Sequence, residues 1–538
     1  MPKRQSQNRI QPFNMDLAGI APATPRCERG ILLLYYRPLQ DCERLQVFNL
    51  YYCILIDRMA KAKGKPVAAR HVSIVSPSTR KKLEPVLKTV LRDVKPSEKE
   101  MEQMTFYSNQ LILRLLQVAP KDVEIISAGS VARGTQIRGT SDIDIFLLFP
   151  KTQSEDAMEK KGIELAKKVV AKHKNESFMI KYAEHPYVRL IFNDVGLNAD
   201  IVPAFKIANA SERITAVDRT QLHNEFINKA LTARQRDDVR ILKAFLKAHN
   251  IYGAGAEFDA FSGYLCELLV HHYGSFIDVV SAFATLKLPK VILPLNRGEH
   301  KQGSEELKNM VKKFNKDFIV IDPTDPDRNV AAVVSKEAVA RLSVAARLLL
   351  GEPSIKVFYG PRYSEVYSER KITHLRDALH LNVYTLAFKM RDIAPDILWQ
   401  QLRRLKGKLE YSMKKEGFHV VLSLENISGT TGVIALLISD AYVGHFLAEG
   451  PSAFMNESAG RFLAAHPKAL GIFFKEDRIL ALEEARYNTP KELITDLLSN
   501  DGEFPSYLKK KNMRLFMNNM PEDIAKLVYS AFIRKTTI

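Results

Sequence analysis

Residues 124–150 read EIISAGSVARGTQIRGTSDIDIFLLFP and predict a strand, a glycine turn, a short basic connection and a second strand. The apolar runs Ile125-Ile126 and 146–149 are short and bounded by Gly, Ser and Pro, which is typical of buried strands. Side chains alternate along a strand, so Asp142 and Asp144 should project from one face of it. Neighbouring carboxylates repel each other unless a cation lies between them, and a hard divalent ion such as Mg²⁺ prefers oxygen ligands. This stretch therefore predicts a metal site on a β-sheet.

A third carboxylate, Asp200, lies in a strand predicted over 197–202. If that strand pairs beside the strand of Asp142 and Asp144, the three carboxylates converge. A cluster of this kind holds two divalent metal ions, of which one binds the phosphates of a nucleotide and the other lowers the pKa of an attacking hydroxyl. Asp200 is then best placed to bind the second ion and to assist deprotonation.

The glycine turn between the first two strands suits a phosphate. Gly129 has no Cβ, so the backbone can approach an anion closely, while Ser130 offers a hydroxyl and an N–H and Arg133 adds positive charge. A lone Gly-Ser pair is usually an ordinary turn, and a lone Asp-x-Asp is usually a solvated edge or a helix cap. Their combination with a third strand aspartate is much rarer and indicates nucleotidyl transfer. The chain has no G-x-x-x-x-G-K-[ST], G-x-G-x-x-G or H-E-x-x-H motif.

The composition favours a large basic protein. At 538 residues, with 46% apolar residues, the chain can form about two to four domains. The formal net charge of +18 indicates a polyanionic partner such as a nucleic acid, although a merely soluble basic protein is the alternative on charge alone. The four cysteines show no zinc-finger spacing, and no apolar run approaches the ~20 residues of a membrane span. We therefore expect a cytoplasmic protein in a reducing compartment, with no membrane partner.

Residues 1–58 differ from the rest of the chain. They hold three of the four cysteines and show no clear helical or strand period, and the N-terminus lacks the features of a signal peptide. We interpret them as an atypical extension that is translated upstream sequence, with the natural start at Met59. The alternative is a genuine extension of unknown use. Mass spectrometry of the native protein distinguishes the two, because a peptide from residues 1–58 would contradict the later start.

The remaining pattern mixes helices and strands. Two helices, over 78–94 and from Ser97, are expected to pack against the sheet of the aspartates, and Ser97 and Glu100 have capping-box spacing. Further helices are predicted over 154–173, 234–249, 264–273 and 336–350. Further strands are predicted over 178–183 and 187–193, with a turn at 193–196. After a boundary at 351–353, strands and helices alternate over 383–389, 395–414, 419–424 and 433–448. These elements predict an α+β multidomain fold.

Four downstream segments carry a family resemblance. They read AVDRTQLHNEF (216–226), DDVRILKAFLKAHNIYGA (237–254), FSGYLCELLVHHYGSF (261–276) and DPTDPDRNVA (322–331). With the Gly-Ser turn and the three aspartates, they resemble the archaeal-type, class I CCA-adding enzymes. These are tRNA nucleotidyltransferases of the superfamily that includes DNA polymerase beta and the poly(A) polymerases. The resemblance covers most of the chain and loosens after the boundary at 351–353.

The resemblance implies an enzyme that adds C, C and A in turn to the 3′ end of tRNA from CTP and ATP, with two Mg²⁺ ions and no nucleic-acid template. It implies a polymerase beta-like catalytic head with a mixed sheet, a helical neck, and an α/β C-terminal body and tail that grip the acceptor and T arms. This grip should rest on shape and phosphate contacts, because A-form RNA hides its base edges. We assign the head to 59–225, the neck to 226–352 and the body and tail to 353–538.

The resemblance also assigns roles to residues. Asp142, Asp144 and Asp200 match the catalytic, metal-binding carboxylates. The nucleotide-binding residues that it implies are Ser130, Arg133, Thr220, His223, Lys243, Tyr252 and Arg328. Basic candidates for tRNA contact, on one helix and near the C-terminus, are Arg403, Arg404, Lys406, Lys509, Lys510 and Lys511. Trp399 is the only tryptophan, so an aromatic stacking surface in the tail must come from Tyr and Phe.

Two other functions are compatible with the three aspartates. One is another RNA 3′-terminal nucleotidyltransferase, such as a poly(A) polymerase, and the other is a catalytically inactive RNA-binding protein. The motifs after residue 216 favour CCA addition over the first, and the intact aspartates disfavour the second. The oligomeric state is left open between a monomer and a homodimer.

Overall fold

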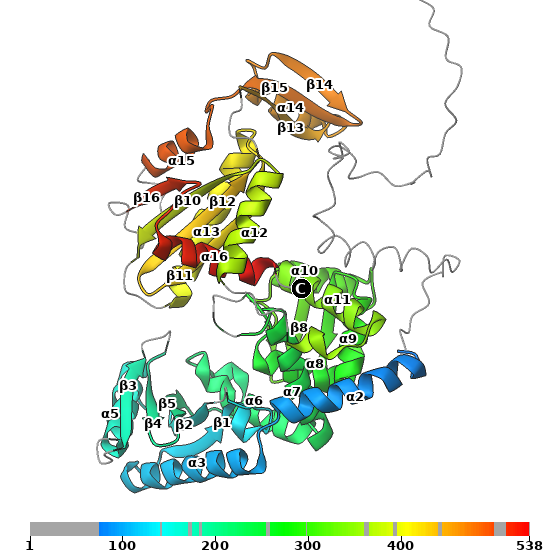
Figure 1. The fold of residues 1–538 in the computed structure, drawn as a ribbon. Helices are drawn as coiled ribbons and strands as arrows, with labels where there is room; N and C mark the ends of the chain where they lie inside the picture. Colours follow the sequence, from blue (N-terminus) through cyan, green and yellow to red (C-terminus); the bar gives the residue numbers. More distant parts are fainter. Residues whose placement is uncertain are drawn as a thin grey trace, which may run out of the picture. The chain divides into compact units, whose positions relative to one another are not determined.

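The computed structural model (Figure 1) describes residues 75–139, 142–170, 175–181, 185–253, 255, 259–296, 298–359, 365–390, 395–439, 444–499 and 513–536. The predictions for residues 1–58 and for Lys509, Lys510 and Lys511 lie outside these residues. Among the helices of the described ranges, none is both long and apolar enough to cross a membrane.

A five-stranded mixed sheet carries the three aspartates. Its strand order is β1-β2-β5-β4-β3, in which β2 and β5 run parallel and the other neighbours run antiparallel. The strands are β1 (Glu124–Ala128), β2 (Ile143–Phe149), β3 (Glu176–Lys181), β4 (Tyr187–Phe192) and β5 (Leu197–Phe205). The predicted turn at 193–196 joins β4 to β5, with Gly196 at φ +66°. The prediction of a mixed sheet built from these stretches is confirmed.

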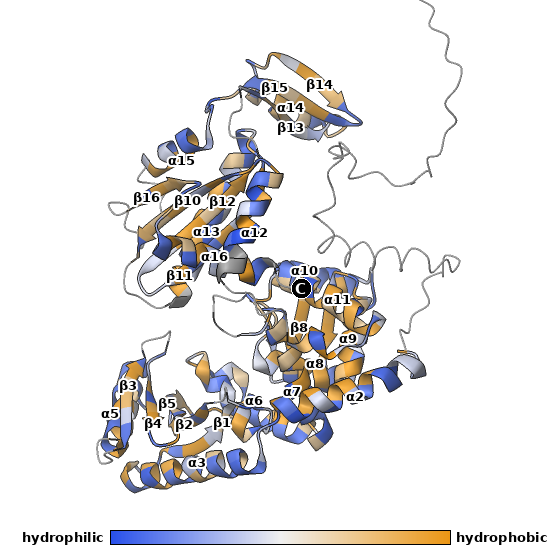
Figure 2. Ribbon diagram, in the orientation of Figure 1, coloured by the Kyte–Doolittle hydropathy of each residue, from blue (hydrophilic) through white to orange (hydrophobic). Residues whose placement is uncertain are grey.

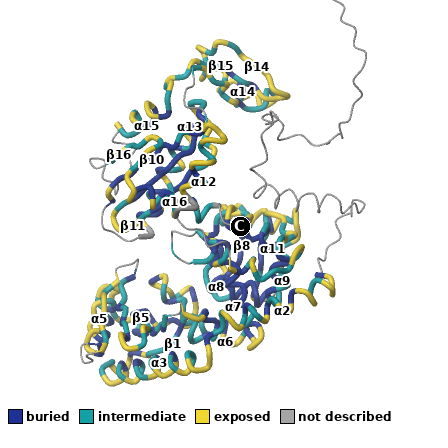
Figure 3. Tube along the Cα trace, in the orientation of Figure 1, coloured by how far each residue is buried: buried dark blue, intermediate teal, exposed yellow. Residues whose placement is uncertain are grey.

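Two helices, α3 (Glu98–Val118) and α5 (Glu155–Val170), cover one face of this sheet. The capping box predicted at Ser97 and Glu100 begins α3. Leu111 of α3 packs in one core with Ile143 and Ile145 of β2, and Figure 2 shows the apolar character of these strands. The strands β2 and β5 are almost entirely buried (Figure 3). Side chains alternate along each strand, so the aspartates lie on the face opposite the residues that contact the helices.

The first described helix, α2 (Pro77–Val94), packs elsewhere. Its Leu83, Leu87 and Val90 belong to the core of the helices in the middle of the chain, so the expectation that it packs against the sheet is wrong. An apolar stripe shows which face of a helix is buried, but it does not show which element buries it.

Helices dominate the middle of the chain. They are α6 (Thr220–Ala230), α7 (Ala233–Ala248), α8 (Gly263–Tyr273), α9 (Phe276–Ala284), α10 (Glu305–Phe314) and α11 (Lys336–Gly351), with shorter 3-10 turns at Ala210–Glu212, Val217–Arg219, Pro294–Asn296 and Ile355–Phe358. A small sheet of order β7-β6-β8-β9 was not predicted from the sequence. Its strands are β6 (Lys290–Leu293), β7 (Gly298–Glu299), β8 (Phe318–Asp322) and β9 (Asp325–Asn329). They are two to five residues long, which is too short for alternation to stand out.

The C-terminal part holds an antiparallel sheet of order β11-β12-β10-β16 between two layers of helices. Its elements are β10 (Asn382–Lys389), α13 (Pro395–Lys415), β11 (Val420–Ser428), β12 (Thr431–Ile438), β16 (Arg514–Met517) and α16 (Glu522–Thr536), with α12 (Glu365–Ala378) and α15 (Pro490–Ser499) beside them. A second sheet contains β13 (His445–Ser452), β15 (Arg478–Glu484) and β14 (Gly471–Lys475), with α14 (Asn456–Ala465). The stretch 433–448, which the sequence predicts as one element, contains parts of both β12 and β13. The sequence does not reveal the break, because both halves are apolar and no change of periodicity marks it.

Candidate active site

The three aspartates lie on one face of the five-stranded sheet. In the parallel pair of β2 and β5, Asp144 lies directly opposite Asp200. Asp142 lies immediately before β2 and, at two residues from Asp144, on the same side of the chain. The convergence predicted from the sequence is therefore confirmed.

Arg189 of β4 connects two of these carboxylates. Its Nε lies 2.7 Å from Oδ1 of Asp200, its Nη2 lies 2.7 Å from Oδ2 of the same residue, and Nη2 also lies 2.8 Å from Oδ2 of Asp142. The Asn198 amide donates to the other oxygen of Asp142 at 3.2 Å. Arg189 was not predicted from the sequence. The alternation of β4 could have indicated its direction, because Arg189 lies between two buried apolar residues. In the structure it lies opposite Asp200 on β5.

Negative charge is concentrated at these aspartates. Burial, together with the charges of Asp200 and Asp142, raises the pKa of Asp144 from an ordinary 3.8 to about 7, although Arg133 and Arg189 oppose the shift. A nearby cation would stabilise the ionised form of this carboxylate. Oxygen-only ligands on one face of a sheet also match the preference of a hard divalent ion. The residues present therefore fit a divalent metal site.

The turn after β1 packs directly on Asp144. It forms the short helix α4 (Gly129–Ala132), which contains Ser130. Gly129 has φ +70°, and a Cβ at this position would lie 1.7 Å from Oδ2 of Asp144. Only glycine fits such an approach, so this glycine makes room for the aspartate as well as for the predicted phosphate.

Arg133 follows α4 and is 8% exposed. Its Nε lies 3.1 Å from Oε1 and 3.0 Å from Oε2 of Glu267, a fully buried residue of α8. The Thr135 hydroxyl donates to the same carboxylate at 2.5 Å. Glu267 therefore anchors the loop after α4. It was not predicted from the sequence, because a single glutamate in an apolar helix carries no spacing signal.

Lys243 and Tyr252 lie against the same loop. Lys243 is 2% exposed, and its ammonium donates to the carbonyl and hydroxyl oxygens of Thr135 at 2.9 and 3.2 Å. Burial lowers the pKa of Lys243 although Glu267 opposes the shift, and burial raises the pKa of Tyr252. A Cβ at Gly263 would lie 3.3 Å from the Tyr252 hydroxyl and 3.6 Å from Lys243 Nζ. The ends of the two side chains therefore lie close to the same glycine. The hydrogen bonds of Lys243 to Thr135 stabilise the loop that carries Arg133.

His223 and Arg328 belong to a second polar cluster, which is centred on Asp322 at the end of β8. Asp322 is 1% exposed, and its Oδ2 accepts from His223 Nε2 at 2.8 Å and from Arg328 Nη1 at 2.7 Å. Its Oδ1 accepts from the Tyr264 hydroxyl at 3.1 Å and from the backbone N–H of Thr324 at 2.9 Å. The His223 ring also stacks on Tyr264, with centroids 4.0 Å apart.

The protonation states in this second cluster follow from its hydrogen bonds. Burial raises the pKa of Asp322, but hydrogen bonds from His223, Thr324 and Arg328 outweigh burial and hold the pKa well below its ordinary 3.8. Burial lowers the pKa of His223 although Asp322 opposes the shift. At neutral pH a neutral His223 therefore donates to an ionised Asp322. Asp322 was not predicted from the sequence, although its turn with Thr324, two residues later, is typical of Asp in Asp-Pro-Thr.

Helix α6 connects the two clusters. Thr220 begins α6 three residues before His223, a spacing that places both on one side of the helix. Farther along α6, the Asn224 amide donates to the Ser127 carbonyl of β1 at 3.2 Å. On α8, Glu267 of the loop anchor and Tyr264 of the second cluster have the same three-residue spacing. The predicted nucleotide-binding residues are thus distributed over neighbouring groups around Asp144, Glu267 and Asp322.

The predicted tRNA contacts on α13 have different surroundings. Arg403 lies 2.8 Å from Asp259 and 3.7 Å from Glu425, and Lys406 lies 2.7 Å from Glu425. Arg404 is exposed and does not join these ion pairs. The structure brings Arg403 and Lys406 together and leaves Arg404 apart, and RNA binding by all three stays a prediction.

A mixed sheet with three converging aspartates, and a glycine turn packed on one of them, defines a nucleotidyltransferase. The family model of the nucleotidyltransferase domain matches residues 109–223. Downstream, the model "tRNA nucleotidyltransferase, second domain" matches 237–359, and the model "CCA-adding enzyme, C-terminal domain" matches 381–504.

Known relatives extend over most of the chain. The CCA-adding enzyme of Methanocaldococcus jannaschii is 33% identical over 452 residues, which cover 81% of this chain and 96% of that protein. The CCA-adding enzyme of Methanococcus maripaludis is 30% identical over 451 residues, which cover 81% of this chain and 97% of that protein. The chain therefore belongs to the CCA-adding enzymes, the family that the sequence resembles.

Proposed function

We propose that this protein adds C, C and A in turn to the 3′ end of tRNA, from CTP and ATP, without a nucleic-acid template and with release of pyrophosphate. The observation that carries the proposal is the register of β2 and β5, which places Asp144 opposite Asp200 in a chain of the CCA-adding family. Asp142, Asp144 and Asp200 are all present, which disfavours an inactive RNA-binding relative.

The three aspartates would hold the metal ions, which we propose to be two Mg²⁺. When bound, such ions lower the pKa of the attacking 3′ hydroxyl and neutralise charge on the transferred phosphoryl group. Asp200 is our candidate for the carboxylate nearest the hydroxyl, where it assists deprotonation. Arg189 bridges Asp200 and Asp142 and so keeps both carboxylates oriented toward one site.

The loop after β1 would hold the triphosphate. Ser130 supplies a hydroxyl and an N–H, and Arg133 supplies positive charge. The bond of Lys243 to Thr135 and the ion pair of Arg133 with Glu267 set the shape of this loop before a nucleotide binds. Such preorganisation lowers the entropic cost of placing the phosphate for attack.

The cluster around Asp322 would contact the incoming nucleotide through Thr220, His223 and Arg328. The Arg328 side chain is 32% exposed, whereas Asp322 is fully enclosed, so Arg328 is the member that reaches a ligand. Asp322 fixes the positions of both Arg328 and His223. A fixed set of buried polar groups discriminates between ligands because a wrong partner leaves some of them unpaired.

The C-terminal part would grip the acceptor and T arms of tRNA. Phe473 and Phe474 of β14 are 48% and 66% exposed, and Phe454 is 84% exposed, whereas Trp399 is only 6% exposed. Exposed aromatic rings stack on unpaired bases with little sequence preference. We therefore propose these phenylalanines as the stacking surface that the buried tryptophan cannot supply, with Arg404 contributing phosphate contact.

The test is an extension assay with recombinant protein, Mg²⁺, labelled CTP and ATP, and tRNA that lacks its terminal trinucleotide. We expect the product to grow by C, C and A and then to stop. A long homopolymer would instead support a poly(A) polymerase, and no extension by folded protein would contradict both enzymatic functions.

We further propose that the protein acts in the cytoplasm and that its head, neck and C-terminal part divide near residues 225 and 352. Fractionation of cells tests the location. Limited proteolysis tests the boundaries, because exposed linkers are cleaved before packed elements. Size-exclusion chromatography with light scattering distinguishes a monomer from a homodimer.

A further inference from the structure

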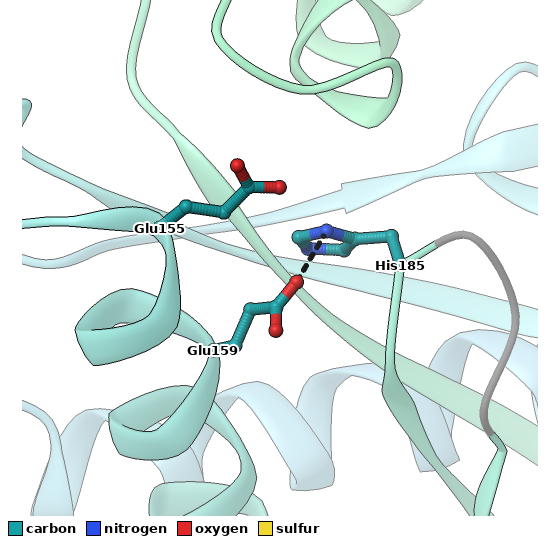
Figure 4. Close-up of side chains that lie close together, drawn as sticks. All are labelled: Glu155, Glu159 and His185. Carbon is teal, nitrogen blue, oxygen red and sulfur yellow. Dashed lines mark ion pairs between the residues drawn. The ribbon is translucent and has the colours of Figure 1, made fainter.

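Three potential metal ligands lie together outside the site described above. Glu155 and Glu159 are four residues apart at the start of α5, and His185 lies two residues before β4. One ligand atom from each of these residues lies within 4.8 Å of the others. Figure 4 shows both carboxylates beside the imidazole ring. Acidic residues at a helix N-terminus are common without an ion, so the histidine is what distinguishes this cluster.

His185 is oriented as a metal ligand would be. It is 6% exposed, and its Nε2 lies 2.6 Å from the Pro203 carbonyl, which can only accept, so Nε2 carries a proton. The other ring nitrogen, Nδ1, is buried, has no hydrogen-bond partner among the described residues and lies 3.1 Å from Oε1 of Glu159. A metal-ligating histidine typically donates its second N–H to a backbone carbonyl, which fixes the tautomer and aims the free lone pair.

Among the residues that the structure describes, neither Glu155 nor Glu159 forms an ion pair with a lysine or an arginine. A neutral imidazole would direct its lone pair at a carboxylate oxygen, which is repulsive. A cation bound between Nδ1 and the carboxylates would remove this repulsion.

The frame around the cluster is closely packed. A Cβ at Gly162 of α5 would lie 2.4 Å from the Cβ of Pro203, so the helix approaches β5 at a distance that only glycine permits. Glu155, Glu159 and Gly162 follow the spacing of a single helix face. The face that carries the two carboxylates is therefore held against the strand whose carbonyl orients His185.

We infer that Glu155, Glu159 and His185 bind a divalent transition-metal ion, with Zn²⁺ as the best fit, at a site separate from the catalytic aspartates. One imidazole nitrogen and two carboxylate oxygens suit Zn²⁺, and water completes a tetrahedral set. Because Glu155 is exposed, a bound ion can be released to the solvent and replaced by another. Pro203 lies three residues after Asp200 on β5, so the bound ion ties α5 and His185 to the strand of a catalytic carboxylate.

The experiment uses the full chain after removal of metals with a chelator. Excess Mg²⁺ is added to occupy the catalytic aspartates, and Zn²⁺ or Co²⁺ is titrated by calorimetry and by the ligand-field absorption of Co²⁺. We expect one ion to bind, and Glu159→Gln and His185→Gln to weaken its binding by more than about 10-fold. Glu164→Gln, which removes the same charge from an exposed position of α5, should bind like the wild type.

Two results would overturn the site. One is equal Zn²⁺ binding by the wild type and Glu159→Gln, and the other is loss of binding in Asp144→Asn, which would place the ion at the catalytic aspartates. Absence of Zn²⁺ and Co²⁺ binding by the wild type would also refute the proposal. If His185→Gln does not fold, Glu159→Gln alone decides, because its side chain is less buried. CCA addition is measured separately, so failure of one proposal does not affect the other.

Discussion

Two aspartate-centred clusters in this protein have opposite electrostatics. On the five-stranded sheet, Arg189 pairs with two of the three carboxylates, and burial with like charge raises the pKa of Asp144. At the end of β8, the single carboxylate of Asp322 accepts hydrogen bonds from His223 and Arg328, and its pKa is lowered. We propose that added cations complete the first cluster, whereas groups of the protein itself complete the second. We therefore expect the first to supply chemistry and the second to supply fixed geometry.

The largest expected effect is on catalysis at the first cluster. Asp144→Asn should lower the rate of CCA addition by on the order of 10³-fold or more, which corresponds to about 4 kcal/mol. The substitution keeps the shape of the side chain but removes the carboxylate charge that binds a metal ion. Asp122→Asn, at an exposed position before β1, is the control. Single-turnover extension and tRNA binding are measured together. An active Asp144→Asn protein would refute the metal assignment, and loss of tRNA binding would point to a folding defect.

The second cluster should instead lose stability. Asp322→Asn removes the ionised partner of His223 and Arg328, and we expect a loss of about 3 kcal/mol in the free energy of unfolding at neutral pH. Asp327→Asn, in the same hairpin at an 86% exposed side chain, should change stability little. Urea unfolding measures both. By contrast, Asp144→Asn should leave the metal-free protein equally or more stable, because it removes a repelled carboxylate.

The loss of stability in Asp322→Asn should depend on pH. The folded-state pKa of Asp322 lies below its ordinary 3.8, so its contribution to stability is present above that pH and is lost as the pH falls toward the folded-state pKa. The difference between wild type and Asp322→Asn should therefore be largest near neutral pH and shrink below pH 3.8. A difference that stayed constant into acid would show that the carboxylate charge is not what stabilises the cluster.

A smaller effect is expected from the turn that packs on the first cluster. Gly129→Ala places a Cβ 1.7 Å from Asp144 Oδ2, so the turn and the carboxylate must separate, and we expect activity to fall by about 10²-fold. Gly196→Ala is the matched control, since Gly196 has a similar φ of +66° and a Cβ there would meet nothing within 4 Å. If both variants lost activity equally, backbone strain and not displacement of Asp144 would explain the effect.

The smallest expected effect concerns the cation that the first cluster already contains. Arg189→Met should tighten divalent-ion binding by roughly tenfold, because the guanidinium and the ion compete for oxygens of Asp142 and Asp200. Arg189→Lys keeps the charge and should bind the ion nearly as the wild type does. Calorimetric titration with Mn²⁺ measures the affinity. Weaker binding in Arg189→Met would mean that Arg189 orients the carboxylates more than it competes for them.

Local patterns predicted much of the fold. The alternation that placed Asp142 and Asp144 on one face, the capping box at Ser97, and the turn at 193–196 are all confirmed. Each of these features depends on residues within a few positions of one another. In and around the five-stranded sheet, the predicted element boundaries differ from the structure by only a few residues.

Features that join distant segments were harder to predict. Three such features are the core in which α2 packs, the short strands β6 to β9 and the second cluster around Asp322. All of them depend on packing between parts of the chain that are far apart in sequence. Arg189 could have been placed on the aspartates' face by alternation, but its ion pairs require the pairing of β4 with β5.

By itself, the sequence determined the chemistry available to this protein: carboxylates on one strand face, a glycine-serine turn, and segments that resemble the CCA-adding enzymes. Tertiary structure decided which charges meet. The pairing of β2 with β5 brings Asp144 opposite Asp200, and β4 adds Arg189 to the same site. The physical reason is that periodicity encodes the direction of a side chain, whereas its electrostatic environment is set by whichever strands and helices pack around it.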